Sequence, residues 1–417
     1  MVALVLVVSG LALTARVVWV GYGPQPDRVA GGITFLERAL ADGAANRMQA
    51  LFPEGEYFTQ VLTGLAEAGS ARDAGAHDAA GRDMLLARAR AHLAVADDPA
   101  TLAVFGPGLV PEHGVFAAGW SLSLAVEIAR TSGDAADLDR VRTGAETMSA
   151  ALTGAPSPFL ASYPGQFWPC DTVVAVSALA DAADLLPESA AQRRTWSELV
   201  TRWRTRALDQ VDPATGLLPH RVSPSGSMII GPRGSSGTVI QAFWPAVVRA
   251  SGPDAARTDD QWRRFTAAFV TREAGLVGIR EYPHGTDGTG DVDSGPLLLG
   301  VSASASAVGL AAARAAGDTE LEASLDREAE LIGAPLTLPG AGTRYVLGVF
   351  PVGDAFLAWA RTRPPVGGAA VPQTADRSPR PLWPAYALPG LVLAGLGVLV
   401  GRGRRRRRPA GLPGSVP

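Results

Sequence analysis

The segment from Glu281 to Pro296, EYPHGTDGTGDVDSGP, holds the richest set of polar side chains in this chain. Its chemically active members are Glu281, Tyr282, His284, Asp287, Asp291 and Asp293. Glycoside cleavage needs one carboxylic acid to protonate the leaving oxygen and one carboxylate to activate water or attack carbon. Asp291 and Asp293 precede an expected helix, a position that suits either role. Two other interpretations stay open. The acids can simply cap that helix while the glycines form turns, or they can bind Ca²⁺, although their spacing does not match an EF-hand.

Two other segments supply further carboxyl groups at expected helix starts. PEGEYFTQ contains Glu54 and Glu56 with Tyr57 beside them, and FWPCD contains Asp171. Acids in a first helical turn are favoured by the helix dipole whatever the function, so capping is again the alternative. The candidate catalytic residues are Asp291, Asp293, Asp171, Glu56, Glu54 and Cys170.

Cys170 is the only cysteine, which excludes an intramolecular disulfide and a cysteine-rich metal cluster. At a helix N-terminus the dipole favours the thiolate and lowers the pKa of a cysteine. Buried free cysteines without a function are common, however. The interpretation of Cys170 as a small buried residue beside a capping acid is the stronger one.

Several polar and aromatic residues in the expected loops could bind a hydroxylated or anionic ligand. The alternative interpretation is that the polar residues only form hydrogen bonds within the loops and that the aromatic residues pack in the core. The histidines are scattered singly, without the spacing of a zinc site, so we expect no metal and no cofactor. The candidate substrate-binding residues are His220, Arg233, Glu281, Tyr282, His284, Trp168 and Tyr57.

Composition and missing motifs narrow the function further. The chain has 417 residues, of which 47% are hydrophobic and 18% charged, so a sizeable core is expected. The net charge of −3 gives no basic surface for nucleic acid. No GxSxG elbow, phosphate-binding GxxxxGK[ST] loop or dinucleotide fingerprint after a strand occurs. Nucleotide-driven chemistry and triad hydrolysis are therefore disfavoured.

Both ends of the chain predict membrane segments. Residues 383–400 are apolar and are followed by an arginine-rich tail, 401–417; the excess of positive charge predicts that this tail is cytoplasmic. Residues 1–23 predict a transmembrane or signal-anchor segment, interrupted by Arg16. Residues 363–381 are rich in proline and glycine and predict a flexible linker. We therefore expect a domain over residues 27–362 on the outer side of the cell membrane.

Between these ends, apolar residues recur at three- and four-residue spacing, which predicts an all-α domain of about a dozen helices. Only short strands are expected, at Met228–Ile230 and Thr343–Leu347. The expected helices are Gly32–Ala41, Gly55–Ala68, Ala80–Ala96, Val115–Ser132, Leu138–Leu152, Asp171–Leu185, Ala190–Asp209, Val239–Ala250, Asp259–Val270, Ser302–Ala316, Glu320–Ile332 and Gly353–Arg361.

Four segments in which a polar loop opens into an apolar helix resemble the six-hairpin (α/α)6 toroid enzymes. They are Asp212–Gly226, Gly231–Pro245, Phe167–Ala180 and Gly290–Ala313. The resemblance spans most of Glu54–Trp359 at the level of pattern. It implies a toroid with short β-hairpin loops, whose loops at one end line a cleft, often for carbohydrate.

Three hypotheses on function follow. The first is an extracytoplasmic glycoside hydrolase or lyase that uses the carboxyl groups and takes a carbohydrate or other small molecule. The second rests on a resemblance to linalool dehydratase/isomerase, which implies a lyase using Cys170; that enzyme uses two cysteines, and this chain has one. The third is a non-catalytic envelope protein that binds glycans or a protein partner whose identity the sequence does not indicate.

Overall fold

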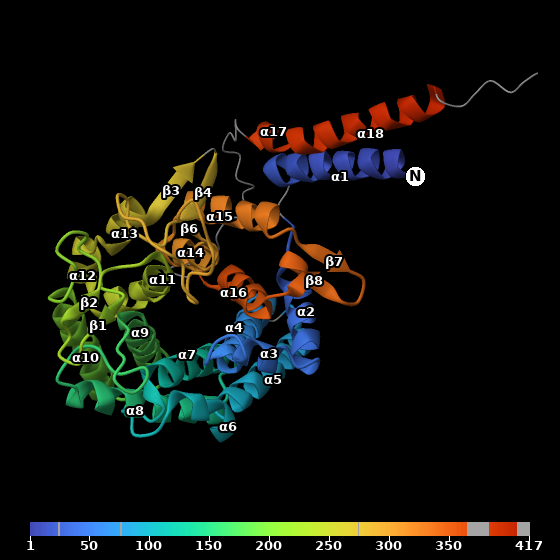
Figure 1. Ribbon diagram of the computed structural model, residues 1–417. Helices are drawn as coiled ribbons and strands as arrows, with labels where there is room; N and C mark the ends of the chain where they lie inside the picture. Colours follow the sequence, from blue (N-terminus) through green and yellow to red (C-terminus); the bar gives the residue numbers. More distant parts are fainter. Residues whose placement is uncertain (24–25, 76, 274, 365–382, 407–417) are drawn as a thin grey trace, which may run out of the picture.

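The computed structural model describes residues 1–23, 26–75, 77–273, 275–364 and 383–406. Most of these residues are helical, which confirms the expected all-α character (Figure 1). The chain forms one helical body, outside which the first and last long helices lie side by side.

The helical body is built around six helices that are buried on most of their faces. Each packs against the next in the chain, and the last packs against the first, so that their contacts form a closed cycle. Their sequences are apolar or small nearly all round, as complete burial requires. These helices are α4 (Gly55–Ala74), α7 (Gly114–Ser132), α9 (Pro169–Leu185), α11 (Gly234–Ala250), α14 (Ala303–Ala316) and α16 (Pro351–Thr362).

A second set of helices covers the outside of this cycle, and each buries one apolar stripe. In α10, for example, Trp196 and Trp203 are buried on one side, while the Ser189 side chain caps the N-terminus by accepting from Gln192 N at 3.2 Å. The longer covering helices are α2 (Val29–Ala41), α5 (Ala79–Ala96), α8 (Ala135–Gly154), α10 (Ala190–Leu208), α13 (Gln261–Phe269) and α15 (Thr319–Ile332). Short helical turns are α3 (Ala44–Gln49), α6 (Pro99–Leu102), η1 (Ala103–Phe105), α12 (Pro253–Thr258) and η2 (Val346–Gly348).

The described strands form only two-stranded antiparallel sheets in the loops. The expected strand Met228–Ile230 is present as β2, and β8 overlaps the start of the other expected strand. The pair β3–β4 was not expected; β3 begins at Val270, where the expected helix ends. The pairs are β1 (Arg221–Val222) with β2 (Met228–Ile230), β3 (Val270–Glu273) with β4 (Leu276–Ile279), β5 (Leu297–Leu298) with β6 (Val301–Ser302), and β7 (Leu336–Leu338) with β8 (Gly342–Arg344).

The expected helices are all present, and their bounds differ mainly at the ends. For example, α4 continues to Ala74, and α11 begins at Gly234 rather than Val239. The earlier start of α11 follows from its contacts, because Gly234 N donates to Glu281 O at 2.9 Å and holds the first turn in place. Most of the expected linker, 363–381, and the tail after residue 406 lie outside the described residues.

The two terminal helices are long and apolar enough to cross a membrane. They are α1 (Val2–Tyr22) and the stretch Trp383–Arg402, which contains α17 (Trp383–Tyr386) and most of α18 (Leu388–Arg406). Glycines let them pack closely: a Cβ added at Gly10 would lie 2.4 Å from Gly390 O. Gly397 contacts Ala3, so the two helices run antiparallel.

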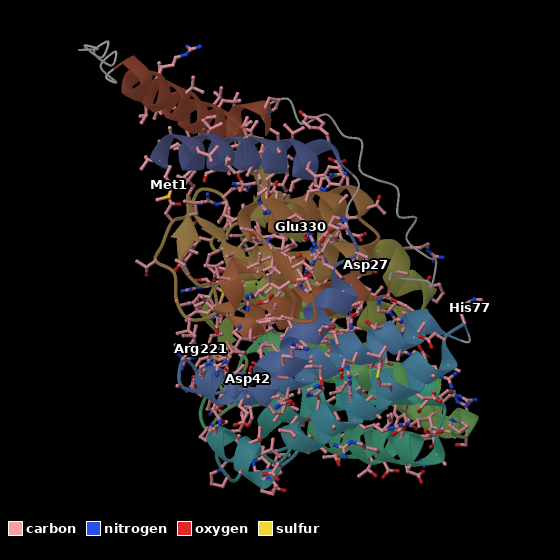
Figure 2. The ribbon with its side chains drawn as sticks, turned by 90° about the vertical axis from the view of Figure 1, so that its right-hand side faces the viewer. Met1, Asp27, Asp42, His77, Arg221 and Glu330 are labelled. Carbon is pink, nitrogen blue, oxygen red and sulfur yellow. The ribbon has the colours of Figure 1, made fainter. Side chains whose placement is uncertain are left out.

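The helix pair contacts the helical body near Val20 and Trp383, at the C-terminal end of α1 and the start of α17. Arg327 Nη1 donates to Val20 O at 2.8 Å, and Trp383 Nε1 donates to Gly275 O at 2.8 Å. Arg16 donates to the backbone oxygen of Glu330, which lies on the side of the body facing α1 (Figure 2). The ring of Trp383 is completely buried against Gly21, so protein rather than lipid covers it.

The closeness of α7 and α9 can be tested at Gly119. A Cβ added there would lie 2.9 Å from Ala175 Cβ and 3.1 Å from its backbone nitrogen, which cannot move without shifting α9. We expect Gly119→Ala to destabilise the full chain in detergent by about 1–3 kcal/mol through overpacking. Gly154→Ala is the matched control, because a methyl there meets nothing within 4 Å and the helical position favours alanine. Equal unfolding midpoints for the two variants in denaturant would contradict the packing described.

Candidate functional site

Acidic side chains from loops far apart in the sequence come together where the buried helices α4, α9 and α14 begin. Glu54 is the N-cap residue of α4, Asp171 lies in the first turn of α9, and Asp293 lies in the loop before α14. The charges of Glu54 and Asp293 both act on Asp171, and those of Asp291 and Glu54 both act on Asp293. We call Glu54, Asp171 and Asp293 the carboxyl cluster.

Asp171 is the buried member of the carboxyl cluster. The hydroxyl of Ser162 donates to one of its oxygens at 2.5 Å, and the Cys170 thiol approaches the other at 3.5 Å. Burial raises the pKa of Asp171 to about 7, and the negative charges of Glu54 and Asp293 add to this effect. Asp171 therefore holds a proton through much of the range up to neutral pH.

Asp293 is the most exposed member of the carboxyl cluster. The pKa of Asp293 is nevertheless raised to about 6. Desolvation by the surrounding loops is the main cause, and the negative charges of Asp291 and Glu54 raise the pKa further. Asp293 is thus open to water on one side, while dense protein on its other sides desolvates the carboxyl group. Such a carboxyl group can exchange a proton near neutral pH with a molecule arriving from solvent.

Tyr163 adds a phenol to the carboxyl cluster. Its hydroxyl is buried and has no hydrogen-bond partner among the described residues. Burial raises the pKa of Tyr163, and the nearby charge of Glu54 raises it further, although the two groups do not meet the geometry of a hydrogen bond. The ring packs edge-on against Trp168 at a centroid distance of 5.7 Å. Tyr163 is thus a neutral donor directed toward acidic groups.

A second group of charges lies beside the carboxyl cluster, around Arg233. Arg233 Nη1 lies 2.7 Å from Asp291 Oδ2 and 3.8 Å from Glu281 Oε1, and its guanidinium lies 4.8 Å from the ring centre of Tyr282. Glu281 has no exposed surface and accepts from Ser235 N at 3.1 Å and Ser235 Oγ at 2.9 Å. Burial raises the pKa of Glu281 to about 7. These contacts hold the loop that carries Asp293 against the start of α11.

His220 lies near Arg233 and is buried. Its Nδ1 is 3.0 Å from Ser236 Oγ. Burial lowers the pKa of His220 to about 4, and the positive charge of Arg233 contributes. The imidazole is therefore neutral at physiological pH and suits a hydrogen-bonding role.

Three sequence-predicted residues do not join this arrangement. Glu56 lines a different cavity, of about 470 Å³, together with residues of α5 and α6. Tyr57 is completely buried in the core and donates to Ala117 O at 2.5 Å. The ring of His284 is held by Val270 O at 3.0 Å, on the side of the hairpin β3–β4.

The Ca²⁺ interpretation of the acidic loop finds no support in these contacts. Asp287 pairs with Arg280 at 2.8 Å and Asp291 pairs with Arg233 at 2.7 Å. These carboxylates therefore already have cationic partners from the protein.

Sequence reasoning missed Tyr163 and Ser162. Both lie in the segment ASYPGQ, immediately before the FWPCD motif. The sequence could have indicated them as candidates, because they lie in a loop with proline and glycine next to the candidate acid Asp171. Their direction toward Asp171 and Glu54 depends on the turn at Tyr163–Gln166, which only the structure supplies.

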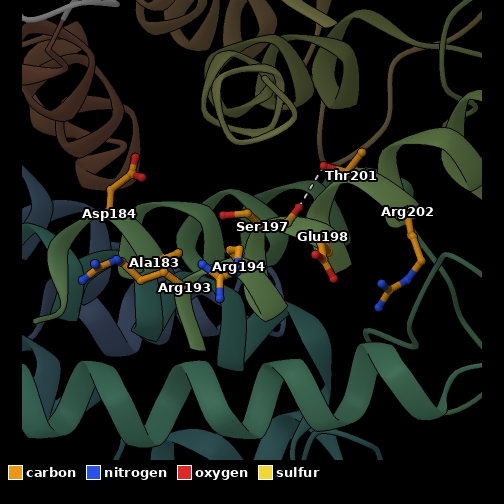
Figure 3. Close-up of a pocket in the computed structure, with 8 residues that line it drawn as sticks. All are labelled: Ala183, Asp184, Arg193, Arg194, Ser197, Glu198, Thr201 and Arg202. Atoms are coloured by element: carbon orange, nitrogen blue, oxygen red, sulfur yellow. Dashed lines mark hydrogen bonds between the residues drawn. The ribbon is translucent and has the colours of Figure 1, made fainter. Parts of the chain in front are cut away.

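A surface depression lies elsewhere on the helical body. It has a volume of about 660 Å³ and is lined by residues of α9 and α10, including Arg193, Arg194 and Glu198 (Figure 3). Thr201 in its wall only closes a helical contact, donating to Ser197 O at 2.8 Å. It contains no member of the carboxyl cluster.

No family model matches the chain, and no curated protein matches it. Its chemistry must therefore be inferred from the residues themselves. The carboxyl cluster, with the phenol of Tyr163 beside it, supplies groups that can donate or accept protons.

The raised pKa of Asp171 makes stability depend on pH. The pKa is about 7 in the folded chain and about 3.9 in an unfolded one, so the folded state holds the extra proton. Binding this proton adds to the free energy of unfolding. The added free energy is fully present below about pH 4 and is lost as the pH rises toward 7. The total loss is on the order of a few kcal/mol. We expect Asp171→Asn to flatten the decline in unfolding free energy over this range. Parallel curves for both proteins, measured by denaturant titration at several pH values, would contradict the assignment.

Proposed function

We propose that this protein is a membrane-anchored enzyme that performs acid–base chemistry on a glycosidic substrate. The observation that carries the proposal is the carboxyl cluster: three acids at or before the starts of three separate helices act on one another through their charges, and two of them have raised pKa values where solvent has access. Perturbed carboxyl groups in one place are typical of catalytic sites. Surface acids that serve only as helix caps have no reason to converge.

The architecture that we propose is the (α/α)6 toroid. The closed cycle of six buried helices supports it, since each buried helix is followed or preceded in the chain by one that packs outside the cycle. In such an arrangement the buried helices run parallel, so their N-termini share one end. Glu54, Asp171 and Asp293 all precede or begin buried helices, as this geometry requires.

The proposed roles follow from exposure and pKa. Asp293 is the general acid, because it is exposed and its pKa of about 6 lets it carry a proton in mildly acidic conditions. Glu54 is the carboxylate that activates water or stabilises positive charge on the substrate. Asp171 is the buried member of the cluster, held in place by the hydroxyl of Ser162. Half-buried Trp168 and Tyr282 offer ring faces against which a sugar can stack.

The lyase alternative with Cys170 as its reactive group has less support. Burial and the neighbouring Asp171 raise the pKa of the Cys170 thiol, so the thiolate is disfavoured. Full activity in Cys170→Ser would exclude this alternative. A glycan-binding protein without turnover is the remaining alternative, which the activity measurement below distinguishes.

We also propose that the helical body lies outside the cytoplasm. The antiparallel pair α1–α18 puts Met1 and the arginine-rich end of α18 on one side and the body on the other. The positive-inside rule assigns the arginines to the cytoplasm. The exposed apolar residues along both helices suit contact with lipid.

The topology is tested by reporter fusions. A fluorescent protein that matures only in the cytoplasm should fluoresce when fused after Pro417, and protease added to intact spheroplasts should cut the helical body. Protection of the body, together with a non-fluorescent fusion, would reverse the proposed orientation.

The catalytic proposal is tested with two neighbouring glutamates. On any glycan or aryl glycoside that the full-length protein cleaves, Glu54→Gln and Asp293→Asn should lower turnover by about 10²–10⁴-fold, the usual contribution of an acid–base group. Glu56→Gln is the matched control and should retain the activity, because Glu56 lies in a different cavity. Equal activity in all three variants would overturn the assignment. Glycan binding without turnover by the unmodified protein would favour the binding function.

A further inference from the structure

A second polar cluster lies within the helical body, away from the carboxyl cluster. It consists of Glu37 on α2, Glu67 on α4 and His92 on α5, and one ligand atom of each lies within 4.8 Å of the others. Glu67 lies on α4, thirteen residues after Glu54, the N-cap of that helix. This spacing corresponds to about 20 Å along the helix axis. The two clusters are therefore separate sites.

Glu67 is the unusual member of this cluster. Its side chain has no exposed surface, and neither carboxylate oxygen has a hydrogen-bond partner among the described residues. A buried carboxyl group without partners is costly and rare in folded proteins. Two charged groups act on Glu67: the carboxylate of Glu37, and the guanidinium of Arg88, whose Nε lies 3.8 Å from Glu37 Oε2.

His92 is oriented as a metal ligand. Its Nδ1 lies 2.6 Å from Gln60 Oε1, which accepts the Nδ1 proton, so that Nε2 is the nitrogen available to an ion. That Nε2 lies 2.8 Å from Glu37 Oε1 and 3.4 Å from Glu67 Oε2. A nitrogen that faces two carboxylates needs a positive bridge to them, which either a proton on Nε2 or a bound metal ion supplies; the metal ion would also give the unpartnered Glu67 a ligand contact.

We propose that Glu37, Glu67 and His92 bind one divalent transition-metal ion, Zn²⁺ in particular. Zinc bonds to nitrogen and oxygen of about 2.0–2.2 Å place tetrahedral neighbours roughly 3.3 Å apart, which the His92–Glu67 separation already matches. The His92–Glu37 contact must open by a few tenths of an ångström, and the Glu37 side chain, 29% exposed, has room to move. The imidazole ligand favours zinc over Ca²⁺ or Mg²⁺, which prefer oxygen ligands alone.

The ion would connect the covering helix α2, which follows the membrane helix α1, to α4 and α5. Two carboxylates neutralise its charge, and water reaches it past Glu37 to complete the coordination. The proposal does not depend on the catalytic activity proposed above, since no substrate is involved.

The test is Zn²⁺ binding by the full-length protein in detergent, carried on a tag without histidines. After chelation and dialysis, calorimetric titration with Zn²⁺ alone should show one ion per chain, and the melting temperature should rise on binding. Glu67→Gln and His92→Gln should abolish this binding, and Gln60→Leu should weaken it by about 10–100-fold through loss of the support for His92. Glu322→Gln, a part-buried glutamate paired with Arg314, is the matched control and should bind zinc like the unmodified protein.

Because Glu67→Gln removes an unpartnered buried carboxyl group, we expect that variant to fold, and circular dichroism checks this. Absence of stoichiometric zinc binding by the unmodified protein overturns the proposal. Zinc binding of unchanged affinity in folded Glu67→Gln overturns it equally.

Discussion

The close approach of the six buried helices is the constraint on which the rest of the structure depends. At Gly119 the helix α7 comes so near Ala175 of α9 that a single methyl group has no room. Similar contacts elsewhere rely on small residues, as where Gly64 of α4 faces Leu124 of α7. Helices that pack this tightly around a closed cycle cannot shift independently. Their ends, and the loops that precede them, are therefore held in fixed positions.

That rigidity explains how unfavourable electrostatics can persist at the helix starts. Like charges brought together and desolvated raise the pKa values of Asp171 and Asp293, at a cost in folding free energy. The surrounding contacts resist their separation: Glu281 joins the acidic loop to α11 through Ser235, and Phe167 O accepts from Val222 N at 3.1 Å. Partial positive charge at the buried helix N-termini offsets part of the repulsion.

Buried charged groups join the elements of the body that lie next to the two terminal helices. Glu330 pairs with Arg28 at 3.0 Å and with Arg361 at 3.2 Å, and Tyr345 donates to the same carboxylate. Arg28 precedes α2 and Arg361 lies on α16, so one buried glutamate joins the start of the body to its last buried helix. Together with the Arg327 contacts to α1, this network fixes the body against the helix pair.

The sequence by itself determined the features that depend on neighbouring residues: the helices, the two apolar termini and the acid-rich loop before α14. Helical periodicity and hydropathy are local properties, and they are readable without a partner. It also identified Asp171, Asp293 and Glu54 as candidates, but it could not separate Glu54 from Glu56. Residues two apart on a helix face different directions, and only packing decides which direction is the site. Tertiary structure alone decided that the carboxyl groups lie close enough to act on one another, because they stand at or before helix starts more than a hundred residues apart. It likewise brought Glu37, Glu67 and His92 together from three helices, where no spacing along the chain indicates a common site.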